Sequence, residues 1–350
     1  MLTRADLAKY PFVNEATDYL RTLGVSIDDI SSAGYEPILE RAQSRLQEAL
    51  AKGIVSGDIL DEQVEILSFP VSNLILVLAG EDRARRRYAL AEAKRAYELL
   101  RREPPEKMEY IANSSFGWKI KRVDYQIDSQ VFDFKVGIVN YLTNSVKLKE
   151  PRWKLVNRIV DAGYVYLTRD ETARLLEEEV RDRIFTRTGP KNGLQSIPDS
   201  LGIVLEHVRT AITKYLGAPA RYELPGTAMP KAMPPCIQHL IKDLDVGKNV
   251  QHMGRFTLAS FLANIGTDQE EIVRLFKPAS DFSERMTRYQ VEHIAGKRGG
   301  GTKYTCPMCT TLKTHGVCYK PDELCATIRN PLSYYKQKAR SLSKEMKSTS

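Results

Sequence analysis

Cysteine is missing from the first 235 residues of this 350-residue chain, and all five cysteines lie between Cys236 and Cys325. The opening residues contain no apolar core of signal-peptide length, and the longest apolar stretch, Val71–Ala79, is far too short to span a bilayer. We therefore expect a cytoplasmic protein with no membrane partner. Disulfides are rare in that reducing compartment, so clustered cysteines indicate a metal site instead.

Net charge is likewise missing from the first 230 residues, where acidic and basic side chains cancel. Residues 231–350 hold 19 Lys and Arg against 11 Asp and Glu, so they carry the whole formal charge of +8. A neutral N-terminal part and a basic C-terminal part suggest that the C-terminal part contacts a polyanion such as a nucleic acid. A basic surface that only keeps the protein soluble is equally compatible with the charge alone.

The sequence also lacks the patterns of several enzyme classes. Polymerase chemistry needs carboxylates that hold two metal ions, and the one suitably spaced pair in the back half, Asp243 and Asp245, is typical of solvated loops. No flavin or nicotinamide fingerprint accompanies the cysteines, and the glycine run 299–301 belongs to no Walker pattern. We therefore assign no catalytic residue. The lone histidines are interpreted as structural or solvent-exposed: His207, His239 and His315.

Helical patterns dominate what is present. Residues 3–106 are predicted to be helical, with apolar stripes in Glu36–Ala51 and Arg83–Arg102 that face a core. Gly117–Ile127 alternates as a strand does, and residues 130–146 are predicted to return to helix. The fold class is therefore mainly α, with a small α/β insertion in an N-terminal helical domain.

Another helix is predicted to begin at Pro151 and to end at Gly163, which would supply a left-handed cap. Tyr164–Leu167 is predicted to be a short strand, and Thr168 to open a charged helix that runs to about Thr186. The apolar face expected on the first of these helices comprises Trp153, Val156, Ile159 and Val160.

Prolines mark a boundary between two domains. Five of them fall between Gly217 and Pro235, where fixed φ angles and missing N–H donors oppose both helix and sheet. Charge and cysteine content change at the same place. Four segments are therefore predicted: an N-terminal domain over 1–216, a proline-rich linker over 217–230, a mostly helical C-terminal domain over 231–340, and a basic tail over 341–350.

The cysteine spacing alone leaves the kind of metal open. Cys306 and Cys309 form a C-x2-C pair, Cys318 and Cys325 a C-x6-C pair, and Cys236 lies about seventy residues upstream. A C-x2-C pair followed by two more cysteines fits a tetrahedral zinc site, although zinc sites usually pair two such knuckles. Iron–sulfur clusters tolerate looser spacing and distant ligands. Spacing slightly favours zinc, in which case the chain would be a zinc-ribbon adaptor that binds nucleic acid.

Four sequence blocks carry a resemblance to a known family. One block near the C-terminus is TKYTCPMCTTLKTHGVCYKPDELCATIRNPLSYY. It resembles the C-terminal signature of the large subunit of archaeal and eukaryotic DNA primases. The opening of the same domain is similar to MPPCIQHLIKDL and GRFTLASFLANIG, and the N-terminal half of archaeal members is similar to WKLVNRIVDAGYVYL. The resemblance touches both halves of the chain, and its C-terminal motifs are the more specific.

This resemblance implies one [4Fe–4S] cluster bound by one remote and three local cysteines. The implied ligands are Cys236, Cys309, Cys318 and Cys325. The family segment Tyr-x-x-Pro-x-Cys matches Tyr304, Pro307 and Cys309, which implies Cys309 rather than Cys306 as the first local ligand. Cys306 is then a fifth cysteine that the family pattern does not require.

The resemblance also implies nucleic-acid contacts. A loop before a helix expected over residues 256–265 carries His252 and Arg255, which match the family's contacts to the template and to the 5′-triphosphate end of the primer. Gln251 stands where eukaryotic relatives carry a further basic residue, so one contact is expected to be missing. A second stretch resembles the family's Tyr-x-x-x-His-x-x-Gly-Lys segment. Its candidate contacts are Tyr289, His293, Lys297 and Arg298.

The family assigns catalysis to a separate small subunit. The resemblance therefore implies a non-catalytic large subunit of a heterodimeric DNA primase, which supports RNA primer synthesis for DNA replication. Its N-terminal domain would bind the catalytic small subunit. Its C-terminal domain would bind template DNA, the RNA primer and a nucleoside triphosphate.

Overall fold

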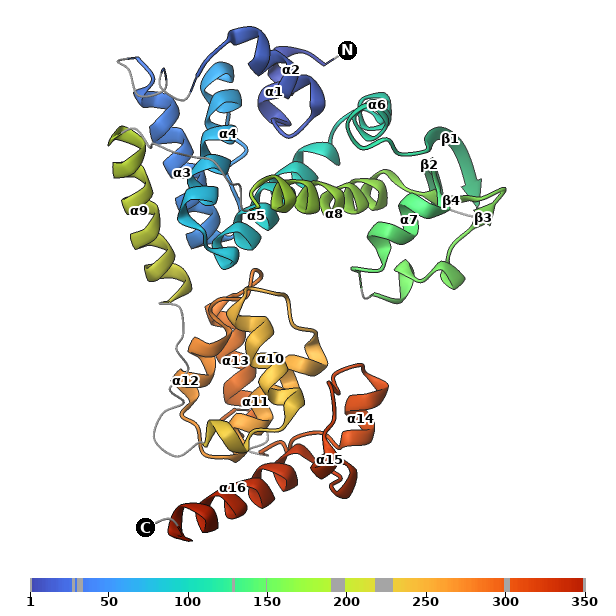
Figure 1. The fold of residues 1–350 in the computed structure, drawn as a ribbon. Helices are drawn as coiled ribbons and strands as arrows, with labels where there is room; N and C mark the ends of the chain where they lie inside the picture. Colours follow the sequence, from blue (N-terminus) through green and yellow to red (C-terminus); the bar gives the residue numbers. More distant parts are fainter. Residues whose placement is uncertain are drawn as a thin grey trace. The chain divides into compact units, whose positions relative to one another are not determined.

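The computed structural model describes residues 2–26, 29, 34–127, 130–148, 150–189, 199–217, 229–298 and 303–348. These residues are mainly helical, as predicted, and one small sheet is formed among them. The chain divides into two compact units, Met1–Glu81 with Arg87–Ala211 and Asp82–Arg86 with Ile212–Ser350 (Figure 1). Most of the predicted linker at 217–230 lies outside the described residues, and the predicted domain boundaries stay predictions.

Side-chain caps mark the starts of some helices in the first half. Asp61 caps α4 by accepting a hydrogen bond from the Val64 N–H at 2.9 Å, and Thr168 forms a capping box with Glu171 at the start of α8. The elements are α1 Arg4–Lys9, α2 Asn14–Leu23, α3 Glu36–Lys52, α4 Glu62–Ala79, α5 Asp82–Leu100, α6 Pro105–Phe116, β1 Ile120–Ile127, β2 Gln130–Gly137, α7 Ile138–Ser145, β3 Val160–Asp161, β4 Tyr164–Leu167, α8 Arg169–Arg187 and α9 Asp199–Leu216.

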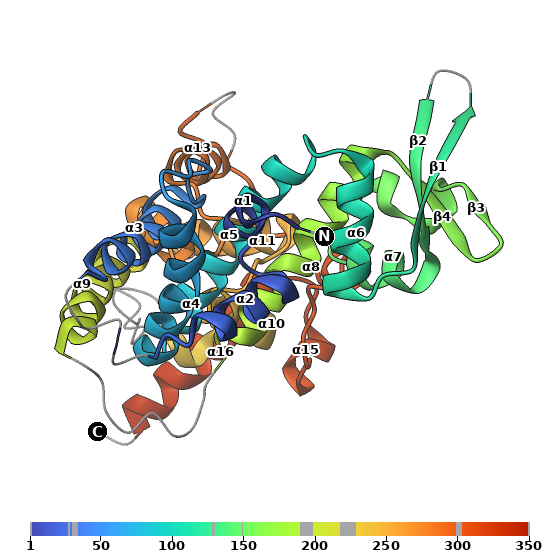
Figure 2. The same cartoon turned by 90° about the horizontal axis from the view of Figure 1, so that it is seen from above.

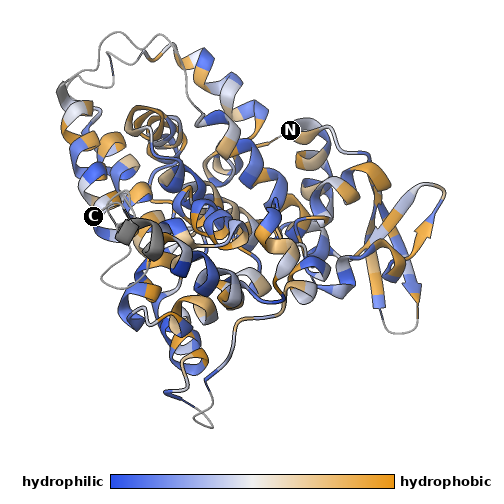
Figure 3. Ribbon diagram, turned by 60° about the horizontal axis from the view of Figure 1, so that its bottom comes forward, coloured by the Kyte–Doolittle hydropathy of each residue, from blue (hydrophilic) through white to orange (hydrophobic). Residues whose placement is uncertain are grey.

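The predicted apolar stripes face the core of the N-terminal unit. Ile38, Leu46 and Leu50 of α3 are buried, while Glu36, Glu40 and Lys52 are exposed. Figure 3 shows this alternation of apolar and polar residues along the helices. The long helices therefore follow from their sequence periodicity.

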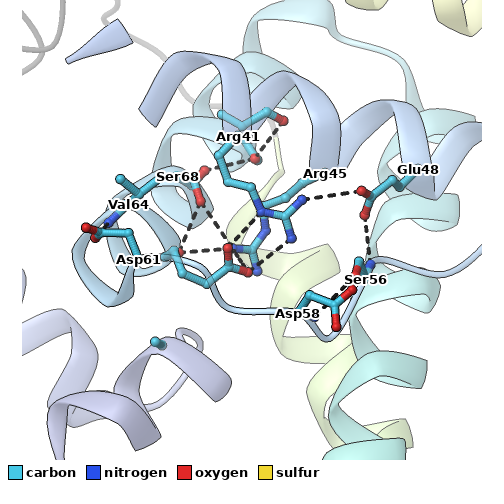
Figure 4. A network of polar contacts seen from close by, with 12 residues as sticks. Arg41, Arg45, Glu48, Ser56, Asp58, Asp61, Val64 and Ser68 are labelled. Carbon is cyan, nitrogen blue, oxygen red and sulfur yellow. Dashed lines mark hydrogen bonds and ion pairs between the residues drawn. The ribbon is translucent and has the colours of Figure 1, made fainter. Parts of the chain in front are cut away.

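A network of charged side chains is buried between α3, α4 and α5 (Figure 4). The Arg45 guanidinium, fully buried, donates to the two carboxylate oxygens of Glu92 at 2.8 and 3.2 Å and to Glu65 at 3.0 Å. Arg95 pairs with the same Glu65 carboxylate at 2.8 Å. Burial alone would raise the pKa of Glu92, but Arg45 and Arg95 outweigh it and hold that pKa below its usual range. Opposite charges from three helices thus balance one another inside the unit.

One four-stranded antiparallel sheet has the order β1-β2-β4-β3. The strand predicted over 117–127 is confirmed as β1, but the helix predicted over 130–146 is wrong in its first half, because residues 130–137 form β2. Phe132, Phe134 and Val136 are buried at a spacing of two, which is the period of a strand and not of a helix. Only α7 is helical there. Figure 2 shows β1 and β2 side by side.

The helix predicted from Pro151 to Gly163 is also wrong. The chain makes two short 3-10 turns, Pro151–Trp153 and Leu155–Asn157, and then pairs β3 with β4. Gly163 is left-handed, as predicted, but together with Ala162 at φ 46° it forms the two-residue turn of a hairpin instead of a helix cap. The expected apolar face is therefore split, since Trp153 is buried whereas Val156 is 86% exposed.

Within the part of the chain that the structure describes, α4 is the one helix long and apolar enough to cross a membrane by length and composition. Half of it is buried inside the N-terminal unit, and its Glu65 belongs to the buried ionic network. A long apolar helix that supplies core side chains passes the same test. We interpret α4 as a core helix.

The C-terminal unit packs around α10, α11 and α12, which bury Ile237, Leu258 and Ile272 among others. A Cβ added to Gly254 would lie 2.7 Å from a Val250 methyl and 2.9 Å from a Leu240 methyl, so a larger residue there would displace side chains between α11 and α10. The helices are α10 Pro235–Asp245, α11 His252–Asn264, α12 Gln269–Phe276, α13 Glu284–Ile294, α14 Cys309–Thr314, α15 Glu323–Thr327 and α16 Pro331–Ser348. Side chains of the predicted basic tail beyond Leu342 lie outside the description.

Candidate functional site

Four of the five cysteines line one cavity in the C-terminal unit. Cys236 lies in the first turn of α10, Cys309 begins α14, Cys318 follows that helix, and Cys325 lies in α15. Together they surround about 310 Å³ whose remaining wall is mostly apolar, including Leu312. The fold thus brings a cysteine from the start of the unit beside three cysteines from its end.

Backbone contacts hold the local cysteines in place. The Cys309 N–H donates to the Arg329 carbonyl at 2.9 Å, and the Cys325 N–H donates to the Asp322 carboxylate at 3.0 Å. Asp322 is held in turn by the Tyr334 hydroxyl at 2.6 Å. Residues of α16 and of the segment before it therefore support the cavity wall.

Cys306 lies elsewhere. It is buried, its Sγ lies 3.9 Å from the Thr257 carbonyl of α11, and it does not contribute to the cavity lining that the described residues form. Burial, with a smaller effect from neighbouring thiols, raises the pKa of Cys306 and that of Cys236 to about 12. Both thiols are therefore protonated at neutral pH, and a metal bound by Cys236 would displace the proton of that thiol.

Four thiols that line one cavity form a donor set for a thiolate-bound metal centre. A zinc ion would bind its thiolate sulfurs at about 2.3 Å from one point. A four-iron cluster presents its irons at separate corners, so its four thiolates surround a volume. Cys236, Cys309, Cys318 and Cys325 surround such a volume and could hold it. Their assignment as ligands stays a prediction.

A second cavity, here called the Arg255 pocket, opens between α11 and α13 and measures about 350 Å³. His252 is the first residue of α11 and Arg255 lies one turn along, because this helix begins at His252 and not at the predicted Phe256. Tyr289 and His293 reach the pocket from successive turns of α13. The structure therefore brings together four of the six predicted nucleic-acid contacts.

Arg255 is held by acceptors of the protein itself. Its Nε donates to the Val250 carbonyl at 2.8 Å, and one terminal nitrogen donates to the Asn249 side chain at 3.0 Å. The same nitrogen forms an ion pair with Asp281. Its orientation is fixed before any ligand binds, and a carboxylate already occupies part of its hydrogen-bonding fork.

Aromatic rings form the other side of the Arg255 pocket. The His293 ring stacks on Tyr289 with a centroid distance of 6.3 Å, and it lies tilted against Tyr304 with a centroid distance of 5.5 Å. Tyr304 then contacts Phe256 edge-on at 5.8 Å. A pocket with one guanidinium and several aromatic faces can bind a nucleotide through both phosphate and base.

The remaining two predicted contacts lie outside the described lining of the pocket. Lys297 follows α13, and Arg298 pairs with Glu292 while its guanidinium lies 5.8 Å from the Tyr289 ring centroid. The glycines at 299–301 fall outside the described residues. Sequence reasoning missed Asp281, for which we find no signal. It also missed the pocket role of Tyr304, which had been noted only as part of the cysteine motif.

Comparison with known proteins adds independent findings. A family model described as the C-terminal domain of the large subunit of eukaryotic and archaeal DNA primase matches residues 226–350, and the model of the N-terminal domain matches residues 8–188. The chain is 37% identical to the DNA primase large subunit PriL of Methanocella arvoryzae, over 97% of this chain and 90% of that protein. It is 34% identical to that of Methanococcoides burtonii, over 95% and 92%, and 32% identical to that of Halobacterium salinarum, over 95% and 92%.

Proposed function

The chain belongs to the family of eukaryotic and archaeal DNA primase large subunits, and on this basis we propose how it serves a primase. Its N-terminal unit binds the catalytic small subunit. Its C-terminal unit holds a [4Fe–4S] cluster and binds template DNA together with the 5′-triphosphate end of the RNA primer, or the initiating nucleoside triphosphate. The complex works in the cytoplasm and needs no membrane.

The Arg255 pocket is the observation that carries the nucleotide-binding part of this proposal. His252 and Arg255 lie in the first two turns of α11, and both side chains line the pocket. The Arg255 guanidinium thus offers donors to phosphate, while Tyr289 and Tyr304 offer faces to a base or ribose.

The cysteine cavity supports a structural role for the cluster. When bound, the cluster would supply four iron corners, each taking one thiolate. Cys236 would thereby be tied to Cys309, Cys318 and Cys325, which closes a loop of some ninety residues. The same tie fixes α10 against α14 and α15, so the loop after α10 that leads to the Arg255 pocket is anchored at its start.

Replacing Arg255 by alanine tests the nucleotide site. A charged hydrogen bond to phosphate typically contributes about 1.5–3 kcal/mol, so Arg255→Ala should weaken binding of a triphosphate-ended primer–template by roughly ten- to hundredfold. The same duplex with a 5′-hydroxyl should lose less, because backbone contacts remain. Fluorescence anisotropy with both duplexes measures this difference. Equal losses on the two ends would contradict a triphosphate site at Arg255.

Asp281 provides a matched variant for that measurement. Its carboxylate competes with phosphate for the Arg255 guanidinium, so Asp281→Asn should bind the triphosphate end more tightly than the natural protein does. Weaker binding by Asp281→Asn would mean that Asp281 holds Arg255 in position and does not compete. In either case, initiation by the complete primase should respond more strongly than extension of a preformed primer.

Helix α7 supports the proposal of a docked subunit. Tyr141 and Asn144 face the interior, while Val139, Leu142 and Val146, at spacings of three and four, lie exposed along the other side. Apolar side chains that lie exposed along one side of a helix are typical of a surface that binds another protein. Because the family consists of large subunits, the catalytic small subunit is the partner that we assign to this face.

Leu142→Asp tests this docking face. A charge placed at the centre of an apolar interface should weaken binding of the purified small subunit by at least about tenfold. Leu60→Asp is the matched control, since Leu60 is fully exposed on a loop of the same unit. Isothermal titration calorimetry gives both affinities, and a chain truncated after Leu216 should bind as the full chain does. Equal affinities for Leu142→Asp and Leu60→Asp would remove α7 from the interface.

A further inference from the structure

The loop that holds Arg255 also borders a second hollow. Asn249 and Val250 contact Arg255, whereas their neighbour Lys248 lines a separate cavity of about 530 Å³. Its other walls come from α10, through Lys242, and from Lys320 in the loop after Cys318. We call this cavity the lysine hollow. Among the described residues, the lining of the hollow and that of the Arg255 pocket have no member in common.

The charge of the lysine hollow is positive. Lys242, Lys248 and Lys320 face a single carboxylate, Asp243. Asp243 is already engaged, because it accepts from Lys248 at 2.7 Å and lies 3.4 Å from the His239 ring nitrogen. Two ammonium groups therefore remain in excess, and a concave surface focuses their field on a bound anion.

A rigid aromatic wall positions one of these lysines. His239 and Tyr319 stack with ring centroids 3.6 Å apart at 11°, and the Lys320 ammonium lies 5.5 Å from the Tyr319 centroid. Lys320 adopts a left-handed conformation, φ 36°, which is uncommon for a residue with a Cβ. His239, interpreted from the sequence as a lone structural or solvent-exposed histidine, is half-buried and part of this wall.

We propose that the lysine hollow is a second phosphate-binding site, for the single-stranded nucleic acid that also enters the Arg255 pocket. This inference rests on the proposed function of that pocket. Lys248 and Arg255 are seven residues apart, so their Cα atoms lie within about 25 Å of each other. A polymer of phosphates can cover both cavities along the 248–255 loop, whereas a free nucleotide can occupy one of them.

Strand length provides the test, with the full chain and its cluster intact. Lys242→Ala combined with Lys320→Gly removes two ammonium groups, and glycine accepts the left-handed conformation without strain. Binding of a single strand of about sixteen nucleotides should weaken about tenfold at low salt, and its salt dependence should fall by about 1.4 in slope. A strand of about four nucleotides, which the Arg255 pocket alone can hold, should bind unchanged.

Lys336→Ala combined with Arg340→Ala is the matched control, because both side chains are exposed on α16 of the same unit. An equal loss from the two double variants would overturn the lysine hollow in favour of a general basic surface. The proposal would also be overturned if the variant with Lys242→Ala and Lys320→Gly lost affinity for a glutamate-rich peptide but kept its affinity for the long strand. Arg255→Ala distinguishes failure of this proposal from failure of the proposed function. If Arg255→Ala weakens binding of the long strand and the lysine variant does not, the Arg255 pocket binds nucleic acid and the lysine hollow does not.

Discussion

Purified without oxygen, the protein is expected to be brown with about four irons per chain, and Cys236→Ser to be colourless. Cys236 lies in α10, far in sequence from the other cysteines, yet it lines the same cavity. A serine hydroxyl is a much poorer iron ligand than a thiolate, so three cysteines would remain for four iron corners. Visible absorption and iron analysis of the two proteins, prepared side by side, measure the loss.

Cys306→Ser is the matched control for that experiment. Both cysteines are buried, and each substitution replaces a thiol by a hydroxyl. Cys306, however, points toward the Thr257 carbonyl instead of the cavity. Its variant should keep the colour and the iron. A colourless natural protein with one zinc per chain would contradict the cluster and favour the zinc-ribbon alternative.

Sequence reasoning reached the cysteine cavity by resemblance and not by spacing. Spacing slightly favoured zinc, because the C-x2-C pair of Cys306 and Cys309 looks like one zinc knuckle. In the structure this pair is divided: Cys309 begins α14 and lines the cavity, whereas Cys306 packs against α11. Two cysteines three positions apart can face different neighbours when a helix begins between them. That start could not be located from the cysteines alone.

The two errors in the N-terminal unit have different causes. Residues 130–137 alternate with period two, and the segment from Pro151 to Val160 has helix-like apolar spacing without helical hydrogen bonds. The Asn157 side chain instead donates to the Pro151 carbonyl at 2.8 Å, and Arg158 donates to the Tyr166 carbonyl at 3.1 Å. Such side-chain contacts to backbone carbonyls compete with a helix. The Arg158 contact depends on β4 lying beside this segment, so the apolar spacing of residues 151–160 alone did not reveal it.

The Arg255 pocket shows the same limit. His252 and Arg255, and Tyr289 and His293, are three or four positions apart, so each pair shares one helix face and could be recognised in the sequence. Asp281 lies 26 residues beyond Arg255 and meets it only because α12 and α13 fold back beside α11. Residues that come into contact only through tertiary packing, as Arg255 and Asp281 do, show no pattern in the local sequence.

Replacing Arg45 is expected to destabilise the N-terminal unit by about 3–5 kcal/mol at neutral pH. Arg45→Met keeps most of the side-chain volume but leaves Glu65 and Glu92 with Arg95 and Arg41 as their remaining partners. A buried carboxylate that loses its closest cation becomes harder to ionise. Thermal and urea unfolding, followed by the helical circular-dichroism signal, measure the change. Arg21→Ala, which removes an exposed i,i+3 pair with Asp18, should change stability by less than about 0.5 kcal/mol.

The pH dependence of that loss distinguishes a lost charge pair from lost packing. In the natural protein the pKa of Glu92 is lowered, so its contribution is present above the pKa of the unfolded chain and is lost as the pH falls through the folded value. In Arg45→Met, burial should raise the pKa of Glu92 above the unfolded value, and stability should then fall as the pH rises. The destabilisation should therefore be smaller near pH 4 than at pH 7, and Glu92→Gln added to Arg45→Met should recover part of it at pH 7. A loss that is the same at both pH values would assign the effect of Arg45 to its volume and not to its charge.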